Sequence, residues 1–469
     1  MATPVASVSS APPDRVGLTS ARSPGERAAL ATIAISGTLA PLNSTMIAVA
    51  LPAIMLAYGA SLASAGWLVT SYLVVMAAVQ PAAGKLGDQL GRRSLILGGL
   101  VGFGLATLGA LIAPTLAVLT AFRLLQALGA AIALPNGVAL VREVVPEQRR
   151  AASFGLIGAV ISIAAAAGPP LGGLLVSTAG WQAIFYMNVP IILAALLLGW
   201  RSLPRHTGAP RGQPFDLIGA GLLSAVLVGL SLLLRQVGAA PLGASALATA
   251  GVVLLGGLFV YRELHCREPV FHPRFFARRS FSAATAAVAL SNLAMYSTLL
   301  ALPVILTRQA HWTTGRVGLV LTALSAANVL CAPVGGRLAD RFGRRWPVVA
   351  GLALAAVAFT PLLWEAPTWS GGVLALTLAL AGAGLGIASP GMQTAAVEAV
   401  PARQAGAASG MYSTSRYLGS IVGSSVLPLL FTASVPSVMT VQHVFLLVVL
   451  AAAGAALASL GLQSRPSAT

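Results

Sequence analysis

The chain has 469 residues, of which 57% are hydrophobic and only 8% charged, and its mean hydropathy is +0.87. Soluble domains carry about 25% charged residues, so this composition excludes a soluble protein. Although the net charge is +17, the sequence has no basic soluble face, which argues against nucleic-acid binding. Apolar stretches of about 20 residues recur, each long enough to cross roughly 30 Å of hydrocarbon. Since they do not alternate, and backbone groups in lipid must pair within the segment, we expect an all-α membrane protein.

Fourteen membrane-spanning helices are predicted in chain order. Residues 1–27 form a Ser-, Pro- and Ala-rich tail without the apolar core and cleavage site of a signal peptide, and we expect this tail to be disordered. The predicted spans are 28–53, 66–83, 94–113, 117–141, 151–176, 182–200, 217–234, 244–261, 282–306, 316–336, 346–364, 371–396, 406–432 and 442–462.

The basic residues predict the orientation of these helices. If the N-terminus is cytoplasmic, the cytoplasmic segments hold 23 of the 28 Lys and Arg residues. Only Arg235, Arg308 and Arg316 then fall in outer loops, while Arg123 and Arg416 fall inside helices. This bias predicts a multi-pass protein of the cytoplasmic (inner) cell membrane with both termini in the cytoplasm.

One charged sequence occurs twice. PAAGKLGDQLGRR at 81–93 aligns without gaps with PVGGRLADRFGRR at 333–345, at an offset of 252. REVVPEQRRAAS at 142–153 is similarly echoed by VEAVPARQAGAAS at 397–409. These echoes predict two six-helix bundles of parallel orientation, a known transporter plan, with helices seven and eight as an inserted pair. The predicted division is a tail at 1–27, a bundle at 28–200, a linker with the inserted pair at 201–280, a second bundle at 281–462, and a tail at 463–469.

Side chains that could carry catalysis or bind a metal are scattered. The five His residues follow no metal-ligand spacing, and no Ser-His-Asp grouping occurs. All eleven acidic residues lie in tails, loops or predicted helix ends. The sequence therefore predicts that the protein is not an enzyme and has no metal or other cofactor, and it gives no evidence of a required protein partner.

The repeated loop resembles a known signature. GKLGDQLGRR is similar to the loop between the second and third helices of the major facilitator superfamily. Four further stretches resemble, in order, motifs of its fourteen-helix drug:proton antiporter branch: NSTMIAVALP (43–52), RLLQALGAA (123–131), GPPLGG (168–173) and WQAIFYMNVP (181–190). The resemblance covers the whole chain and implies a proton-driven exporter of drugs or antibiotics that works by alternating access. Uptake of an organic anion or nutrient by the same fold, and a lipid-handling membrane protein or enzyme, are the alternatives.

Two groups of residues are implied as gates. Glycines in the repeated loops allow tight turns, and Asp88 can accept bonds from Arg or from a helix N-terminus. The resemblance implies that this network closes the cytoplasmic side, although the arginines could simply anchor topology. The expected gate residues are Gly84, Asp88, Gly91, Arg92, Glu143, Asp340, Arg344 and Glu398. The antiporter motif, implied to bend near the outer gate, comprises Gly168, Pro169, Gly172 and Gly173; both residue types are also common in membrane helices generally.

Polar and aromatic residues within the predicted helices are candidates for substrate or proton contact, or alternatively for bonds between helices. They are Asn43, Tyr72, Arg123, Gln126, Asn136, Asn292, Tyr296, Asn328, Gln393, Tyr412 and Arg416. The family assigns the arginine of the RLLQALGAA motif, Arg123, to proton coupling, and Gln126 shares its helix face.

The first-helix motif departs from the family pattern. The family usually has an acidic residue where this chain has Asn43, and that acid is associated with proton coupling and cationic drugs. Arg416 lies ten residues into its predicted helix, near mid-membrane, with no acidic residue placed to pair with it. We therefore expect a net positive cavity that disfavours dicationic drugs and accepts neutral or anionic amphiphiles.

Overall fold

A computed structural model describes residues 23–205, 216–236, 242–266, 269, 271–364, 370–401, 404–431 and 438–464, and these residues form helices without strands. The helices are α1 (Pro24–Ala57), α2 (Leu62–Ala65), α3 (Trp67–Leu90), α4 (Arg92–Leu111), α5 (Leu116–Val144), α6 (Glu147–Ala179), α7 (Ala183–Ser202), α8 (Leu217–Gln236), α9 (Leu242–His265), η1 (Pro273–Ala277), α10 (Arg279–Arg308), α11 (Thr314–Phe342), α12 (Arg345–Phe359), η2 (Thr360–Leu363), α13 (Gly371–Glu398), α14 (Ala405–Leu430) and α15 (Val438–Ser459).

The predicted all-α membrane architecture is confirmed. Within the described ranges, twelve helices are long and apolar enough to cross a membrane. α8 adds a shorter apolar stretch, Ile218–Leu234, whereas α14 is not among the twelve because its middle holds Arg416 among several serines. Each of the fourteen spans predicted from the sequence coincides with one of these helices.

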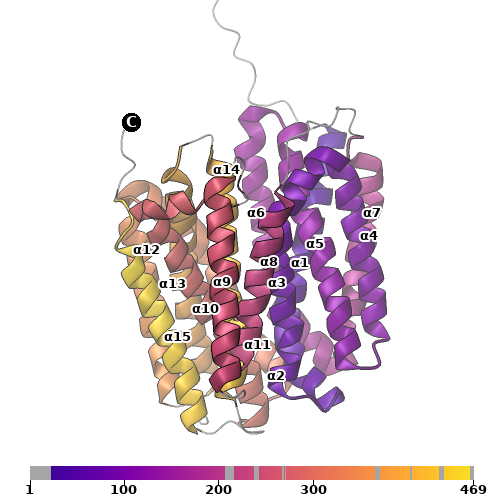
Figure 1. Cartoon of the computed structure of the whole chain (residues 1–469). Helices are drawn as coiled ribbons and strands as arrows, with labels where there is room; N and C mark the ends of the chain where they lie inside the picture. Colours follow the sequence, from indigo (N-terminus) through magenta and orange to yellow (C-terminus); the bar gives the residue numbers. More distant parts are fainter. Residues whose placement is uncertain are drawn as a thin grey trace, which may run out of the picture.

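The helices form two bundles that lie side by side (Figure 1). In the N-terminal bundle α1 packs against α5, α6 and α7, while α4 packs against α5 and α7 and α3 against α5. In the C-terminal bundle α10 packs against α14 and α15, and α13 against α11 and α12. The inserted pair lies outside both bundles, with α8 against α3 and α14 and with α9 against α8.

Close backbone contacts between glycines hold each bundle together at equivalent points. A Cβ on Gly99 of α4 would lie 2.6 Å from the carbonyl oxygen of Gly129 on α5. A Cβ on Gly351 of α12 would lie 2.6 Å from the carbonyl oxygen of Gly384 on α13. Lipid tails are as apolar as helix side chains, so close packing of small residues is what favours helix association in a membrane.

The two faces of the molecule differ in the loops that they carry. The face with residues 81–93 and 333–345, where α1 begins and α15 ends, is termed the loop side, and the opposite face with α2 is termed the far side (top and bottom of Figure 1). The repeated loops turn at Gly91 and Gly343, whose φ angles are 89° and 82°. These angles lie in the left-handed region that favours glycine, which explains why both copies have it there.

Candidate functional site

A cavity of about 250 Å³ lies between the two bundles and has two unlike walls. The C-terminal bundle supplies all the amide, phenol and guanidinium groups of the lining, namely Asn292, Asn328, Gln393, Tyr412 and Arg416. The N-terminal bundle supplies only small side chains, namely Thr45, Ser162, Ala165 and Ala166. One wall can therefore orient a polar group by hydrogen bonding, while the other is smooth. Five predicted site residues meet at this cavity.

Arg416 gives the cavity a positive charge. Its side chain is solvent-exposed, and its guanidinium carbon lies 5.3 Å from the centre of the Tyr417 ring. Tyr412 lines the same cavity one turn away on α14. No carboxylate of the described residues forms an ion pair with Arg416. A cation at mid-membrane is costly unless water or an anion stabilises it.

Three side-chain hydrogen bonds between described residues join the bundles. The Tyr417 hydroxyl accepts a bond of 3.1 Å from the Gln80 amide of α3. The Tyr296 hydroxyl lies 3.5 Å from the Ser44 hydroxyl of α1. Thr70 of α3 donates to Ser424 of α14 at 2.8 Å.

Sequence reasoning missed most of these bridging residues. It identified Tyr296 only as a substrate candidate. A usable signal was present, however, because Ser44 and Tyr296 occupy equivalent positions in the two repeats, 252 residues apart. No comparable pattern marks Gln80 or Tyr417, whose meeting depends on how the bundles dock.

A second polar cluster is buried in the N-terminal bundle, away from the cavity lining. Arg123 is 0% exposed; it donates to Gln126 Oε1 at 2.9 Å and to the Leu68 carbonyl at 3.3 Å. Its guanidinium carbon lies 4.3 Å from the centre of the Tyr72 ring. The Asn43 amide lies 3.5 Å from Gln126 Oε1. The structure thus brings together four predicted residues, but as an internal network rather than as cavity lining.

This cluster contains three buried polar atoms without a hydrogen-bond partner among the described residues: Asn43 Oδ1, Tyr72 OH and Arg123 Nη2. Buried polar groups are nearly always hydrogen-bonded, so three exceptions in one cluster are unusual. Asn43 supplies an amide where a carboxylate would neutralise Arg123.

Asn136 serves the packing of the repeated loop. Its amide nitrogen donates to the carbonyl oxygens of Ala83 and Ile132 at 2.9 and 2.8 Å. The same side chain fills the space that a Cβ on Gly87 would need. Asn136 therefore fixes α5 against the loop end of α3 and does not line the cavity.

On the far side, the predicted antiporter motif on α6 packs closely against α11 and α1, and its contact with α11 is termed the seal. A Cβ on Gly173 would lie 2.9 Å from the Cα atom of Gly318 and from the carbonyl oxygen of Thr314 on α11. Gly168 and Gly172 instead pack against α1, where a Cβ on Gly172 would lie 3.0 Å from the Met46 Cα atom. A Cβ on Gly318 would also collide with the carbonyl oxygen of Pro169. The cavity-lining residues of α6 and α11 lie between this seal and the loop side.

At the loop side, the gate ion pairs between described residues lie within their own bundles. Arg92 pairs with Glu143 at 2.8 Å. Arg344 pairs with Asp340 and Glu398, each at 2.8 Å, and the bonds to Glu398 raise the pKa of the Arg344 guanidinium. The side chain of Asp88 lies outside the described part of the structure, and a Cβ on Gly84 would meet nothing within 4 Å.

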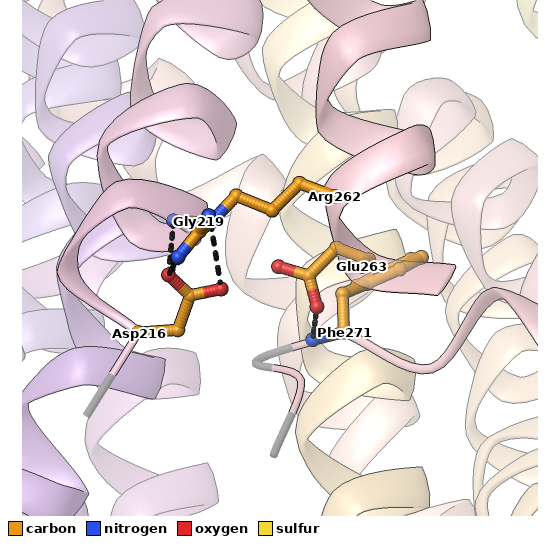
Figure 2. Close-up of polar contacts among 5 residues, drawn as sticks. All are labelled: Asp216, Gly219, Arg262, Glu263 and Phe271. Carbon is orange, nitrogen blue, oxygen red and sulfur yellow. Dashed lines mark hydrogen bonds and ion pairs between the residues drawn. The ribbon is translucent and has the colours of Figure 1, made fainter. Parts of the chain in front are cut away.

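Buried carboxylates join the inserted helices to each other and to the following segment (Figure 2). Asp216, before α8, accepts bonds from the Arg262 side chain of α9 at 2.7 and 2.9 Å and from the Gly219 N–H at 2.9 Å. Burial favours the neutral acid, but the bonds from Arg262 and Gly219 outweigh it and hold the pKa of Asp216 below its usual value. Glu263 accepts a bond from the Phe271 N–H at 2.9 Å.

Two parallel-related helix bundles around a central cavity are a known plan of membrane transporters. The sequence profile of the Major Facilitator Superfamily matches residues 33–273 and 284–468, and the chain belongs to this superfamily. The predicted family membership is confirmed, and with it the prediction that the protein is not an enzyme.

Relatives support the family assignment, and a solved structure supports the fold. The uncharacterized MFS-type transporter YvkA of Bacillus subtilis is 35% identical over 86% of this chain and 90% of its own length. The tetracenomycin C resistance and export protein of Streptomyces glaucescens is 31% identical over 87% and 76%. The multidrug resistance protein Stp of Mycobacterium tuberculosis is 34% identical over 82% and 72%. The crystal structure of a bacterial homologue of the lysosomal transporter Spinster, in an inward-facing conformation, has a TM-score of 0.70 at 17% identity and covers 96% of this chain and 100% of its own.

Proposed function

We propose that the protein is an antiporter of the bacterial cell membrane that exports amphipathic small molecules, such as drugs or antibiotics, by alternating access. The observation that best supports this proposal is the cavity between the two bundles. On the far side of the cavity, the GPPLGG motif packs closely against α11. The excess of Lys and Arg on the loop side supports a cytoplasmic position for that side and for both termini. In this orientation the structure is inward-facing, ready to take substrate from the cytoplasm. Relatives with export and drug resistance in their names support the direction of transport.

The charge of the cavity supports a preference among substrates. Arg416 is the charged side chain of its lining, and the lining contains no Asp or Glu. A dicationic compound would meet a like charge in a medium of low dielectric constant, where repulsion is strong. Neutral or anionic amphiphiles are therefore the proposed substrates.

Protons are the proposed coupling ion. No described Asp or Glu lies near the cavity, so the proton would act at the surroundings of Arg123, at the cytoplasmic carboxylates, or on an ionisable substrate itself. In inside-out vesicles, dissipating the pH gradient with nigericin should stop transport. Transport that continues at the same rate without a pH gradient would exclude proton coupling.

The loop-side ion pairs support a latch that acts in the opposite conformation. Glu143 binds Arg92 and Glu398 binds Arg344, so each arginine is held at the loop side of its own bundle. In the outward-facing state we propose that this network, with Asp88, joins the bundles. Asp88→Asn should then lower transport at normal expression, and Asp340→Asn should do so more weakly. Wild-type transport by Asp88→Asn would refute the latch.

A susceptibility panel in a bacterial host that lacks its own efflux pumps tests the function. Expression should raise resistance to neutral and anionic amphiphilic antibiotics but not to dicationic dyes, and Arg416→Ala should remove the protection. Arg316→Ala is the matched control, because Arg316 is exposed and stacks on Trp312 outside the cavity. Strong resistance to dicationic dyes would contradict the charge preference, and unchanged susceptibility to every compound would contradict export.

A further inference from the structure

Two of the three hydrogen bonds that join the bundles among the described residues use tyrosines, one in contact with Arg416 and the other beside the lining of its cavity. Tyr417 holds Gln80 of the N-terminal bundle and lies beside the Arg416 guanidinium, 5.3 Å from ring centre to guanidinium carbon. Tyr296 lies 3.5 Å from Ser44 of the same bundle and follows Met295, which lines the cavity together with Arg416. The charged group of the cavity is thus adjacent to the bonds that keep the bundles together at mid-membrane.

The third bond is independent of Arg416. Thr70 and Ser424 meet nearer the far side, two turns along α14 from Arg416. Both side chains are buried, at 5% and 2% exposure, and neither lines the cavity. Thr70 and Ser424 therefore stabilise the same closed seam without contact with a bound substrate, which makes them an internal control.

We propose that Tyr417 and Tyr296 are positioning residues that transmit substrate binding at Arg416 to the seam between the bundles. This inference rests on the proposed function, because it assigns the trigger to an anionic group of the transported molecule. A carboxylate bonds Arg roughly twice as strongly as a neutral group does, so a bound anion draws the guanidinium away from the tyrosine rings. The rings lose the cation that holds them in place, and their bonds to Gln80 and Ser44 weaken.

This arrangement supplies the differential contact that alternating access needs. A ligand shifts a conformational equilibrium only if it interacts differently with the two states. In the far-side-closed state the anion competes with Tyr417 and Tyr296 for Arg416, whereas in the open state the two cross-bundle bonds are already broken. An anionic substrate therefore favours outward opening, but a neutral one of the same shape does not.

The test measures the ratio of outward-open to inward-open protein by double electron–electron resonance. Spin labels at Thr178 of α6 and Leu319 of α11, both exposed, span the seal in a variant with Cys266 and Cys331 replaced by Ala. Salicylate, which is ionised at neutral pH, is the probe, and neutral salicylamide is its control. Salicylate should raise the ratio in otherwise unsubstituted protein, and salicylamide should not.

Variants separate transmission from simple loosening of the seam. Tyr417→Phe and Gln80→Leu should each raise the ratio about fivefold without ligand, as loss of one hydrogen bond implies, and salicylate should then add only the smaller change that Tyr296 and Ser44 transmit. Gln80→Leu leaves Arg416 and Tyr417 intact, so it stands in if Tyr417→Phe folds poorly. Thr70→Val should also raise the ratio but should keep the full response to salicylate.

Two results would overturn the proposal: a wild-type salicylate response in Tyr417→Phe and Gln80→Leu, or an equal loss of response in Thr70→Val. Absence of any salicylate response in unsubstituted protein would overturn it as well, even if the susceptibility panel shows export. If the panel shows no export but the response depends on Tyr417, the proposed function fails while the transmission route stands.

Discussion

Asn43 and Arg123 belong to a buried polar cluster in which the Arg123 guanidinium has no carboxylate partner among the described residues. Arg123 is held by Gln126, by the Leu68 carbonyl and by the face of Tyr72, all of which are neutral. Cation–π contact and carbonyl bonds can stabilise a buried guanidinium without a carboxylate. The cluster therefore has no side chain that titrates near neutral pH, in contrast to what the family resemblance leads one to expect.

Asn43→Asp should restore a titratable group to this cluster. The new carboxylate would lie beside Gln126, which already binds Arg123, and the guanidinium has an unpartnered nitrogen to offer. We expect the pH profile of transport in vesicles to change between about pH 5 and 8. We also expect the transport rate of cationic substrates to increase. Asn43→Ser, which cannot titrate, is the control. Superimposable profiles for wild type and Asn43→Asp would show that the cluster does not take part in coupling.

Asp216 offers a test of stability at the inserted helices. Its side chain is 2% exposed and is bonded by Arg262, so Asp216→Asn should lower the free energy of unfolding by about 1–2 kcal/mol. Because the folded-state pKa of Asp216 is lowered, its contribution is present above the ordinary value of 3.8 and is lost as pH falls through the folded pKa. The gap in melting temperature between wild type and variant should therefore be present at neutral pH and shrink in strong acid.

Asp340→Asn is the matched control for this measurement. The Asp340 side chain is 79% exposed in its pair with Arg344, so its loss should cost less than about 0.5 kcal/mol. Equal destabilisation by both substitutions would contradict the assignment of Asp216 as a buried support.

At the scale of helices, the far-side seal has two seams that the internal repeat relates. α6 meets α11 at Gly173 and Gly318, and α3 meets α14 where a Cβ on Gly66 would lie 3.8 Å from Pro428. Gly66 and Gly318 are 252 residues apart, the offset of the repeated loops. In the first seam, backbone atoms of α6 and α11 are in contact. The second seam, between α3 and α14, contains the Thr70–Ser424 hydrogen bond. The antiporter motif thus contributes one of two close contacts on the far side that the repeat relates.

Gly173→Ala should disturb the first seam with a single methyl group. The added Cβ would lie 2.9 Å from backbone atoms of α11, which cannot move aside as a flexible side chain could. Overpacking of this kind typically costs 1–3 kcal/mol, so the far-side-closed state should lose population and export should fall roughly tenfold. Gly158→Ala on the same helix meets nothing within 4 Å and should transport normally. Equal rates for the two variants would show that the α6–α11 contact is dispensable.

For the whole molecule, the sequence predicted what periodicity, hydropathy and internal repetition determine. The fourteen spans follow from runs of apolar residues. The parallel orientation of the two bundles follows from the sequence repeat at an offset of 252 residues. It did not predict which polar residues face one another across the bundles. Asn136 and Asn292 are alike in type and helical context, yet one braces a loop and the other lines the cavity, because helix rotation and docking decide this.

If the protein exports by alternating access, the α6–α11 seal must open and close during each export cycle. The structure offers a direct way to lock it, because a Cβ on Gly315 would lie 3.6 Å from the Ser177 Cβ atom. That separation falls in the range of about 3.5–4.5 Å found in disulfides. A Ser177→Cys and Gly315→Cys pair, with Cys266 and Cys331 replaced by Ala, should therefore cross-link without backbone movement.

The decisive measurement compares export by this cysteine pair before oxidation, after oxidation and after reduction. Export is followed as uptake, into inside-out vesicles, of an amphiphile that the susceptibility panel identifies and that is supplied in the medium. We predict that oxidation stops export, that reduction restores it, and that neither single-cysteine variant responds. Export by the fully cross-linked protein at the rate of the reduced protein would contradict alternating access through this seal.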